Sequence, residues 1–255
     1  MFDRNIHVFS KEEQEKLKNS SVGIVGCGGM GGVSAQIVAR SGVQKITVAD
    51  PDIYNEVNIN NQFNAFKSTL GKNKAEVVGK MLNDINPSIE VSVYKEGLME
   101  SNVKEIVKKS DIILDCVDYN ELFCSYILSN EARKNNKYVL APQAIGYGGS
   151  VLVFDPKGMS FIEYLDLKEN MTRNDFKEIF VSPEKYAPIV PKYMSGEIVQ
   201  KVVKREIPIP NIGLAQTLLS SMMVSEMIFI LLNKRKPTTI PNIIALDLLE
   251  KKLII

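Results

Sequence analysis

The fold of this chain is decided by the stretch Val22-Gly23-Ile24-Val25-Gly26-Cys27-Gly28-Gly29-Met30-Gly31-Gly32. Its first four residues predict a strand, and the run from Val33 to Arg40 predicts a helix. The G-x-G-x-x-G turn between them lets backbone N–H groups and the helix N-terminus approach a phosphate. Taken alone, the motif also fits a glycine-rich turn without a ligand. We expect a nucleotide-binding loop whose contacts come from Gly26, Gly28, Gly29 and Gly31.

A second predicted strand, Ile46-Thr47-Val48-Ala49, ends at Asp50. Asp50 follows Gly31 by about 20 residues, the separation at which such folds hold a ribose-binding carboxylate. The loop and the acid together favour nucleotide binding. Two classes of enzyme share this arrangement, because dehydrogenases bind a dinucleotide with it and nucleotidyltransferases bind ATP.

Strands and helices alternate regularly as far as Phe154. Apolar runs predict strands near residues 22–25, 46–50, 89–94, 112–117, 138–141 and 150–154, and helices are expected near 32–41, 74–84, 102–109 and 121–135. Ser10-Lys11-Glu12-Glu13 is a capping box that begins a further short helix. The alternation predicts an α/β fold with a Rossmann-like, doubly wound, mainly parallel sheet. Ligands then bind at the carboxyl ends of the strands.

A dense polar cluster follows the second predicted strand. It contains Asp52, the segment Asn58-Ile59-Asn60-Asn61-Gln62, and Lys74. A dehydrogenase needs little beyond the glycine loop and the ribose acid before its substrate domain, so this cluster favours an enzyme that uses ATP. Taken singly, Lys74 also fits a solvated surface lysine, and Asp118 fits a helix cap.

These motifs resemble the ThiF/MoeB/HesA family, the adenylating enzymes related to ubiquitin-activating enzyme. The family pattern is a glycine loop, an acid-x-acid strand end, Asn-x-x-Arg-Gln, Gly-x-x-Lys, Ile-Asn-Pro and an Asp-Cys-x-Asp strand end. The chain matches this order with Asp50-Pro51-Asp52, Asn58 to Gln62, Gly71 to Lys74, Ile85-Asn86-Pro87 and Asp115-Cys116-Val117-Asp118. The resemblance is close over residues 2 to about 155 and looser beyond.

The resemblance implies an ATP-dependent adenylyltransferase that activates a carboxylate as an acyl-adenylate. Asp50 would hold the ribose while the glycine loop holds the phosphates. Asn58, Gln62 and Lys74 would contact the triphosphate. The implied ATP-binding set is Gly26, Gly28, Gly29, Gly31, Asp50, Asp52, Asn58, Asn61, Gln62 and Lys74.

The resemblance also implies a magnesium ion and a homodimer. Asp118 would hold Mg²⁺. The opening Phe2-Asp3-Arg4-Asn5 looks like the family's aromatic-x-Arg-Gln start, whose arginine reaches the ATP site of the partner subunit. The implied catalytic residues are therefore Arg4, which acts in trans, with Lys74 and Asp118.

Adenylation suits these residue types. A carboxylate has a reference pKa near 4 and is already ionised at neutral pH, so it needs no general base. The site must supply alignment and positive charge around the phosphate oxygens. The absence of a histidine beyond His7 is compatible with this chemistry.

Two departures from the family pattern stand out. Asn61 replaces the arginine of Asn-x-x-Arg-Gln, and losing one donor at a developing oxyanion costs about 3 kcal/mol in well-studied enzymes. We expect slow adenylation, a substitute cation such as Lys67 or Lys72, or lost catalysis. The cysteines Cys27, Cys116 and Cys124 are isolated and lack zinc-ligand spacing. We therefore expect small buried thiols and an acyl-adenylate that passes to another protein or thiol.

Composition limits the cellular compartment and the kinds of partner that we expect for this chain. The chain has 255 residues, is 45% hydrophobic and carries a formal net charge of +1, which gives no pull toward nucleic acid. Unpaired cysteines and the absence of an apolar leader favour the cytoplasm. We expect one domain over 1–255, with a nucleotide-binding core at 1–155 and a crossover region, an interface helix and closing strands at 156–255.

The C-terminal third is less regular. Several prolines interrupt residues 156–210, which by resemblance guide the substrate's carboxyl tail, with Tyr186, Tyr193 and Met194 as candidate lining residues. The apolar run 212–232 approaches membrane-spanning length, but Gln216 and Glu226 interrupt it, which favours a core or interface helix over a membrane span. Residues 240–247 and 252–255 are expected to form a closing pair of strands.

The substrate is open at this stage. It is a small-molecule cofactor precursor, a peptide, or the C-terminal glycine of a ubiquitin-like sulfur carrier, and the missing zinc and acceptor cysteines favour the first two. Two other classes remain, an NAD(P)-dependent or flavin-dependent oxidoreductase and a non-catalytic nucleotide-binding partner protein.

Overall fold

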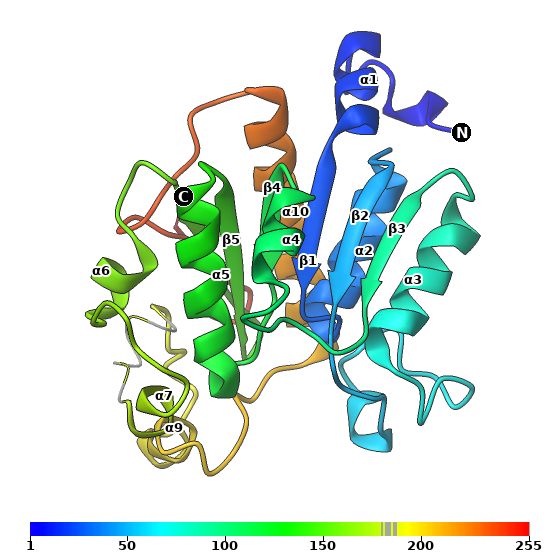
Figure 1. Ribbon diagram of the computed structural model, residues 1–255. Helices are drawn as coiled ribbons and strands as arrows, with labels where there is room; N and C mark the ends of the chain where they lie inside the picture. Colours follow the sequence, from blue (N-terminus) through cyan, green and yellow to red (C-terminus); the bar gives the residue numbers. More distant parts are fainter. Residues whose placement is uncertain (180, 182–184, 186–187, 255) are drawn as a thin grey trace.

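The computed structural model describes residues 1–179, 181, 185 and 188–254. One eight-stranded sheet runs in the order β3-β2-β1-β4-β5-β6-β7-β8 (Figure 1). The first five strands in this order are parallel, whereas β6, β7 and β8 are antiparallel to their neighbours. The strands are β1 (Ser21–Val25), β2 (Lys45–Ala49), β3 (Glu90–Tyr94), β4 (Ile112–Asp115), β5 (Tyr138–Ile145), β6 (Gly148–Phe154), β7 (Ile244–Asp247) and β8 (Lys252–Ile254). The predicted doubly wound, mainly parallel sheet with closing strands is confirmed.

The helices follow the predicted alternation with shifted bounds. The described part of the chain contains α1 (Lys11–Asn19), α2 (Gly29–Arg40), α3 (Lys74–Ile85), α4 (Val103–Lys108), α5 (Leu122–Lys134), α6 (Phe161–Leu165), α7 (Asp175–Glu178), α9 (Gly196–Val203) and α10 (Gly213–Leu232), with 3-10 turns η1 (Asp3–Asn5), η2 (Glu56–Asn58) and η3 (Tyr119–Glu121). The capping box at Ser10 is formed, as predicted. α2 begins at Gly29, three residues before the expected start. Glycines occupy most of its first turn, and they do not contribute to the apolar pattern from which the helix was predicted. β5 continues to Ile145 because it pairs with β6 along that whole length.

Two apolar cores cover the two faces of the sheet. Residues of α2, α3 and α10 pack on one face, among them Val38, Leu82 and Met223. Residues of α4, α5 and α6 pack on the other, with Ile106 and Phe123 at their centre. Burial on both faces explains why the parallel strands are nearly continuous apolar runs.

The long apolar helix α10 is a buried core helix. It packs on α2 and on strands β5 and β6, and half of its apolar window is buried in the protein. Its polar residues also have partners inside the fold, since the Ser220 hydroxyl donates to the Met30 carbonyl at 2.9 Å and Glu226 pairs with Arg235. The preference for a core helix over a membrane span is confirmed.

The proline-rich region passes beside the carboxyl ends of the parallel strands, and its helices α7 and α9 lie at the lower left of Figure 1. Tyr186 and Pro183 lie outside the described residues. The Tyr193 hydroxyl donates to Asp247 Oδ2 at 2.9 Å and accepts from the Tyr147 backbone N–H at 2.8 Å. Tyr193 therefore fastens this region to the end of β7.

Candidate active site

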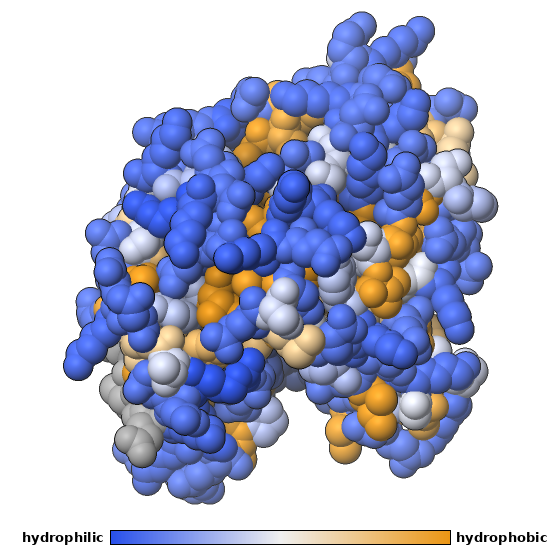
Figure 2. Space-filling model, viewed as in Figure 1, coloured by the Kyte–Doolittle hydropathy of each residue, from blue (hydrophilic) through white to orange (hydrophobic). Residues whose placement is uncertain are grey.

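A cavity of about 850 Å³ lies at the carboxyl ends of β1, β2 and β4. Strand order reverses between β1 and β4, and this is where open α/β sheets bind ligands. Figure 2 shows the surface hollowed at its lower edge, between the parts that carry α9 and η2. Ten predicted residues line the cavity, namely Gly26, Gly28, Gly29, Asp50, Asp52, Asn58, Asn61, Gln62, Lys74 and Asp118.

The glycine loop needs glycine for backbone packing as well as for ligand access. Gly26 has φ +88°, and a Cβ there would lie 2.3 Å from the Cys116 carbonyl oxygen. A Cβ on Gly31 would lie 1.8 Å from the Gly26 carbonyl oxygen. Gly31 does not line the cavity. Gly31 lies in α2, where its lack of a side chain lets the helix approach the turn, and its contact with a ligand stays a prediction.

Asp50 holds the loop in place. Its Oδ2 accepts from the Cys27 backbone N–H at 2.6 Å, and its Oδ1 accepts from the Asp52 backbone N–H at 2.8 Å. The residue is only 5% exposed, and this burial raises the pKa of its carboxyl group. Each oxygen keeps a further acceptor site, so Asp50 can fix the loop and still accept from a ribose hydroxyl.

Lys74 is a buried cation. It begins α3, where the Asn73 side chain caps the helix by accepting from the Glu76 N–H. The Lys74 side chain is 8% exposed, and its Nζ lies 3.0 Å from Asp52 Oδ2. A solvated surface lysine is therefore excluded, and a positive charge is fixed at the β2 side of the cavity.

Asp118 is a cap that also faces the cavity. It caps η3, where its Oδ1 accepts from the Asn120 N–H at 3.0 Å, and it lines the cavity. Among the residues that the structure describes, no group of three or more His, Cys, Asp or Glu side chains is arranged to hold a metal ion. Mg²⁺ is commonly bound by one or two carboxylates together with substrate phosphates and water. Asp118 at a strand end fits that kind of site.

The polar segment around η2 contains residues that shape the turn and residues that face the cavity. Asn58 Oδ1 accepts from the Asn55 N–H at 2.9 Å and so shapes the turn. Gln62 lies against Gly28, and its Oε1 is buried without a hydrogen-bond partner in the described structure. Asn61 Nδ2 donates to Asn211 Oδ1 at 3.1 Å. Asn61 therefore links the nucleotide side of the cavity to a distant segment.

Sequence reasoning missed three polar cavity residues from the C-terminal third: Arg173, Asn211 and Gln216. Gln216 is 6% exposed, lies against Gly29, and donates from Nε2 to Asn211 Oδ1 at 2.6 Å. The place of Gln216 in a largely apolar helix was the available signal. The lining does not include Tyr193 or Met194, because Tyr193 is held at β7.

The thiols are poor nucleophiles. Cys27 is fully buried, whereas Cys116 and Cys124 are half-buried and line the cavity, contrary to the expectation of full burial. Burial raises the pKa of all three thiols, so they stay protonated near neutral pH. The thiolate is the reactive form of cysteine.

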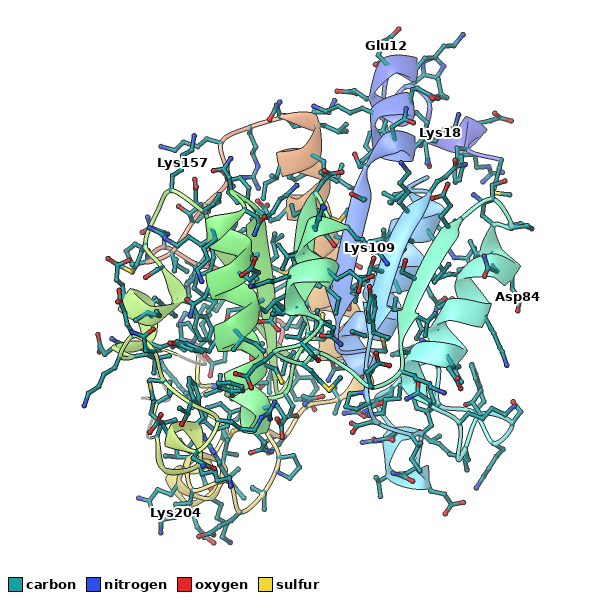
Figure 3. All side chains as sticks on the ribbon, in the orientation of Figure 1. Glu12, Lys18, Asp84, Lys109, Lys157 and Lys204 are labelled. Atoms are coloured by element: carbon teal, nitrogen blue, oxygen red, sulfur yellow. The ribbon has the colours of Figure 1, made fainter. Side chains whose placement is uncertain are left out.

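Arg4 lies far from the cavity of its own subunit. The neighbouring Phe2 ring lies 3.7 Å from where a Cβ on Gly42 would be, between α2 and the amino end of β2. Figure 1 places the N-terminus and α1 at the end of the molecule opposite α9, and Glu12 and Lys204 mark these two ends in Figure 3. Arg4 therefore does not contribute to the cavity of its own chain.

Comparisons with known proteins agree on one family. The sequence profile of the ThiF family matches residues 2–254. A probable molybdopterin-synthase adenylyltransferase of Porphyra purpurea is 32% identical over 160 residues, which is 63% of this chain and 41% of the relative. A tRNA threonylcarbamoyladenosine dehydratase of Bacillus subtilis is 36% identical over 118 residues, 46% of each protein. This chain thus spans less than half the length of either relative.

Solved structures share the fold. A crystal structure of E. coli MccB with ATP superposes with a TM-score of 0.69 at 20% identity, over 94% of this chain and 64% of the other. E. coli tRNA N6-threonylcarbamoyladenosine dehydratase gives a TM-score of 0.64 at 20% identity, over 89% of this chain and 92% of the other.

Proposed function

The chain belongs to the ThiF family, and from this premise we propose that it uses ATP and Mg²⁺ to activate a carboxylate as an acyl-adenylate. The observation that carries the proposal is one cavity wall that combines a glycine loop, the buried Asp50 and the buried Lys74. An NAD site is built on the first two and does not require a fixed cation beside them. ThiF relatives include proteins named as adenylyltransferases.

The reaction requires little covalent chemistry from the protein. A carboxylate oxygen attacks the α-phosphorus and forms the new P–O bond, while the bond to the bridging oxygen breaks and pyrophosphate leaves with the electron pair. Backbone N–H groups at the start of α2 and the Lys74 ammonium group face the phosphates and hold them in line. Asp118 would hold Mg²⁺, which when bound neutralises charge on the phosphate oxygens.

The acyl-adenylate would then pass to a nucleophile outside this cavity. The raised thiol pKa values argue against a thioester on Cys116 or Cys124. The acceptor would be another protein or a thiol. The proposed substrates are a small-molecule cofactor precursor, a peptide, or the C-terminal glycine of a ubiquitin-like protein. We place the enzyme in the cytoplasm, with no nucleic acid or membrane partner.

A ligand-binding experiment tests the nucleotide. ATP with Mg²⁺ at a hundredfold excess over its Kd stabilises the fold by about 2.7 kcal/mol, and NAD, NADP and FAD give smaller shifts. The measurement is thermal unfolding with each ligand at the same concentration. A larger shift with NAD than with ATP would indicate an oxidoreductase instead of an adenylyltransferase.

The homodimer is tested by complementation. Arg4→Ala and Lys74→Ala proteins are each expected to lose ATP turnover. A mixed dimer regains one intact site, because the Lys74→Ala subunit supplies Arg4 to the partner that keeps Lys74. Mixing the inactive proteins therefore restores part of the activity. Proven subunit exchange without restored activity would count against action in trans.

A further inference from the structure

The cavity carries more acid than base. In the described part of the chain it is lined by the acids Asp50, Asp52, Glu96, Asp118 and Glu121 and by the bases Lys74 and Arg173. A polyphosphate brings further negative charge into this space. Lys74 is already paired with Asp52 at 3.0 Å. How strongly the cavity attracts an anion therefore depends on the second base, Arg173.

Arg173 is oriented by the start of α5. One terminal guanidinium nitrogen donates to Glu121 Oε2 at 3.0 Å, and the other lies 3.8 Å from Cys124 Sγ. Its guanidinium carbon lies 4.8 Å from the centroid of the Phe123 ring, which is itself buried. An arginine stacked on an aromatic ring keeps its planar group in a fixed orientation and still presents N–H donors.

Arg173 and Lys74 lie on opposite sides of the glycine loop. Lys74 pairs with Asp52, which follows β2, whereas Arg173 pairs with Glu121, which follows β4. The glycine loop follows β1, and β1 lies between those two strands in the sheet. A phosphate chain at the loop thus has one cation on each side.

We propose that Arg173 is a phosphate-contacting residue of the nucleotide site, an inference that rests on the proposed function. The Arg173 and Glu121 side chains are 49% and 57% exposed, so their ion pair is weak. A phosphate oxygen carries more charge and accepts two parallel N–H bonds from one guanidinium group. Arg173 exchanges Glu121 for phosphate when the nucleotide binds. It supplies the charge that Asn61, which donates to Asn211, does not.

The test is calorimetric titration of Arg173→Gln with adenosine, AMP and ATP–Mg²⁺. Adenosine carries no phosphate, so its Kd stays at the wild-type value. The Kd for ATP–Mg²⁺ rises about tenfold or more, as expected for a lost charged hydrogen bond. An equal rise for AMP places the guanidinium group at the α-phosphate, and no rise for AMP places it farther along the chain. Both results support the proposal.

Two variants serve as controls. Arg173→Lys keeps the charge and is expected to recover part of the lost affinity for ATP–Mg²⁺. Arg40→Gln removes an exposed arginine at the far end of α2 and leaves all three Kd values unchanged. A wild-type Kd for ATP–Mg²⁺ in Arg173→Gln, or an equal loss for adenosine, overturns the inference. If the wild-type protein binds none of the three ligands, the proposed function itself fails.

Discussion

The two walls of the cavity are built differently. On the wall formed by β1 and β2, the Asp50 carboxylate binds two backbone N–H groups, and the capping Asn73 amide donates to the Asp50 carbonyl oxygen at 3.0 Å. On the other wall, the contacts join side chains, as in Asn61 with Asn211 and Arg173 with Glu121. The first wall is fixed by the backbone of adjacent strands. The second is assembled from segments far apart in the sequence.

The largest expected effect comes from removing the carboxylate that fixes the first wall. Asp50→Ala leaves the N–H groups of Cys27 and Asp52 unpaired, which lowers the free energy of unfolding by about 2–4 kcal/mol and removes most of the stabilisation by ATP–Mg²⁺. Urea unfolding with and without ligand measures both effects. Asp50→Asn keeps one oxygen acceptor, so its free energy of unfolding is expected to fall less than that of Asp50→Ala. An Asp50→Ala protein with the full ATP shift would show that this wall is not the nucleotide wall.

A second prediction concerns pH and the buried end of β4. Burial raises the pKa of Asp115 to about 6, with hydrogen bonds from Ser125 and Val117 opposing the shift. Between about pH 4 and about pH 6 the folded state holds a proton on Asp115 that the unfolded state has released. The free energy of unfolding therefore falls as pH rises through this range, and it stays lowered at higher pH. Asp115→Asn removes this dependence and raises the free energy of unfolding at pH 7.5 by at most about 3 kcal/mol.

Asp111, at the amino end of the same strand, provides the matched control. Burial raises its pKa, but hydrogen bonds from Ser21 outweigh this and leave the pKa lowered. Asp111→Asn is therefore expected to destabilise the protein at neutral pH. Urea unfolding across pH 4 to 8 distinguishes the two variants. The same sign of effect for both would contradict the burial account of Asp115.

The smallest effects are expected on the second wall. Asn61→Leu removes its hydrogen bond to Asn211 and lowers the free energy of unfolding by about 1 kcal/mol. Asn211→Leu removes that bond together with the one from Gln216, so it lowers the free energy of unfolding by more. Because the two side chains share one contact, the free energy of unfolding of the double variant falls by less than the sum of the two single losses. Urea unfolding of the four proteins completes the cycle. Strict additivity would show that the two amides act independently.

The same difference between the walls explains what the sequence could predict. The glycine loop, Asp50 and Asp118 stand at or just after strand ends, and parallel strands bring their carboxyl ends together whatever the loops do. Lys74 begins α3 and was expected from the Gly71-to-Lys74 motif instead. Local spacing did not separate the glycines that line the cavity from Gly31, which packs against Gly26. That distinction depends on how closely the helix approaches the turn.

The second wall had no comparable local signal. Asn61 and Asn211 are 150 residues apart, and Arg173 meets Glu121 across 52 residues. Neither residue type nor spacing indicates such pairs in one sequence. Arg173 also lies in the irregular region, where no periodic pattern fixes the direction of its side chain. Only the folded chain shows that these residues face the cavity.

The most direct test of the central claim is pyrophosphate exchange. Wild-type protein is incubated with ATP, Mg²⁺ and labelled pyrophosphate, together with sets of small carboxylic acids, peptides and ubiquitin-like protein tails. The account predicts that label enters ATP only when a carboxylate is added, and that Lys74→Ala abolishes the incorporation. If the protein is saturated with ATP–Mg²⁺ and none of these carboxylates supports exchange, the cavity binds a nucleotide without adenylating a carboxylate, and the central claim is contradicted.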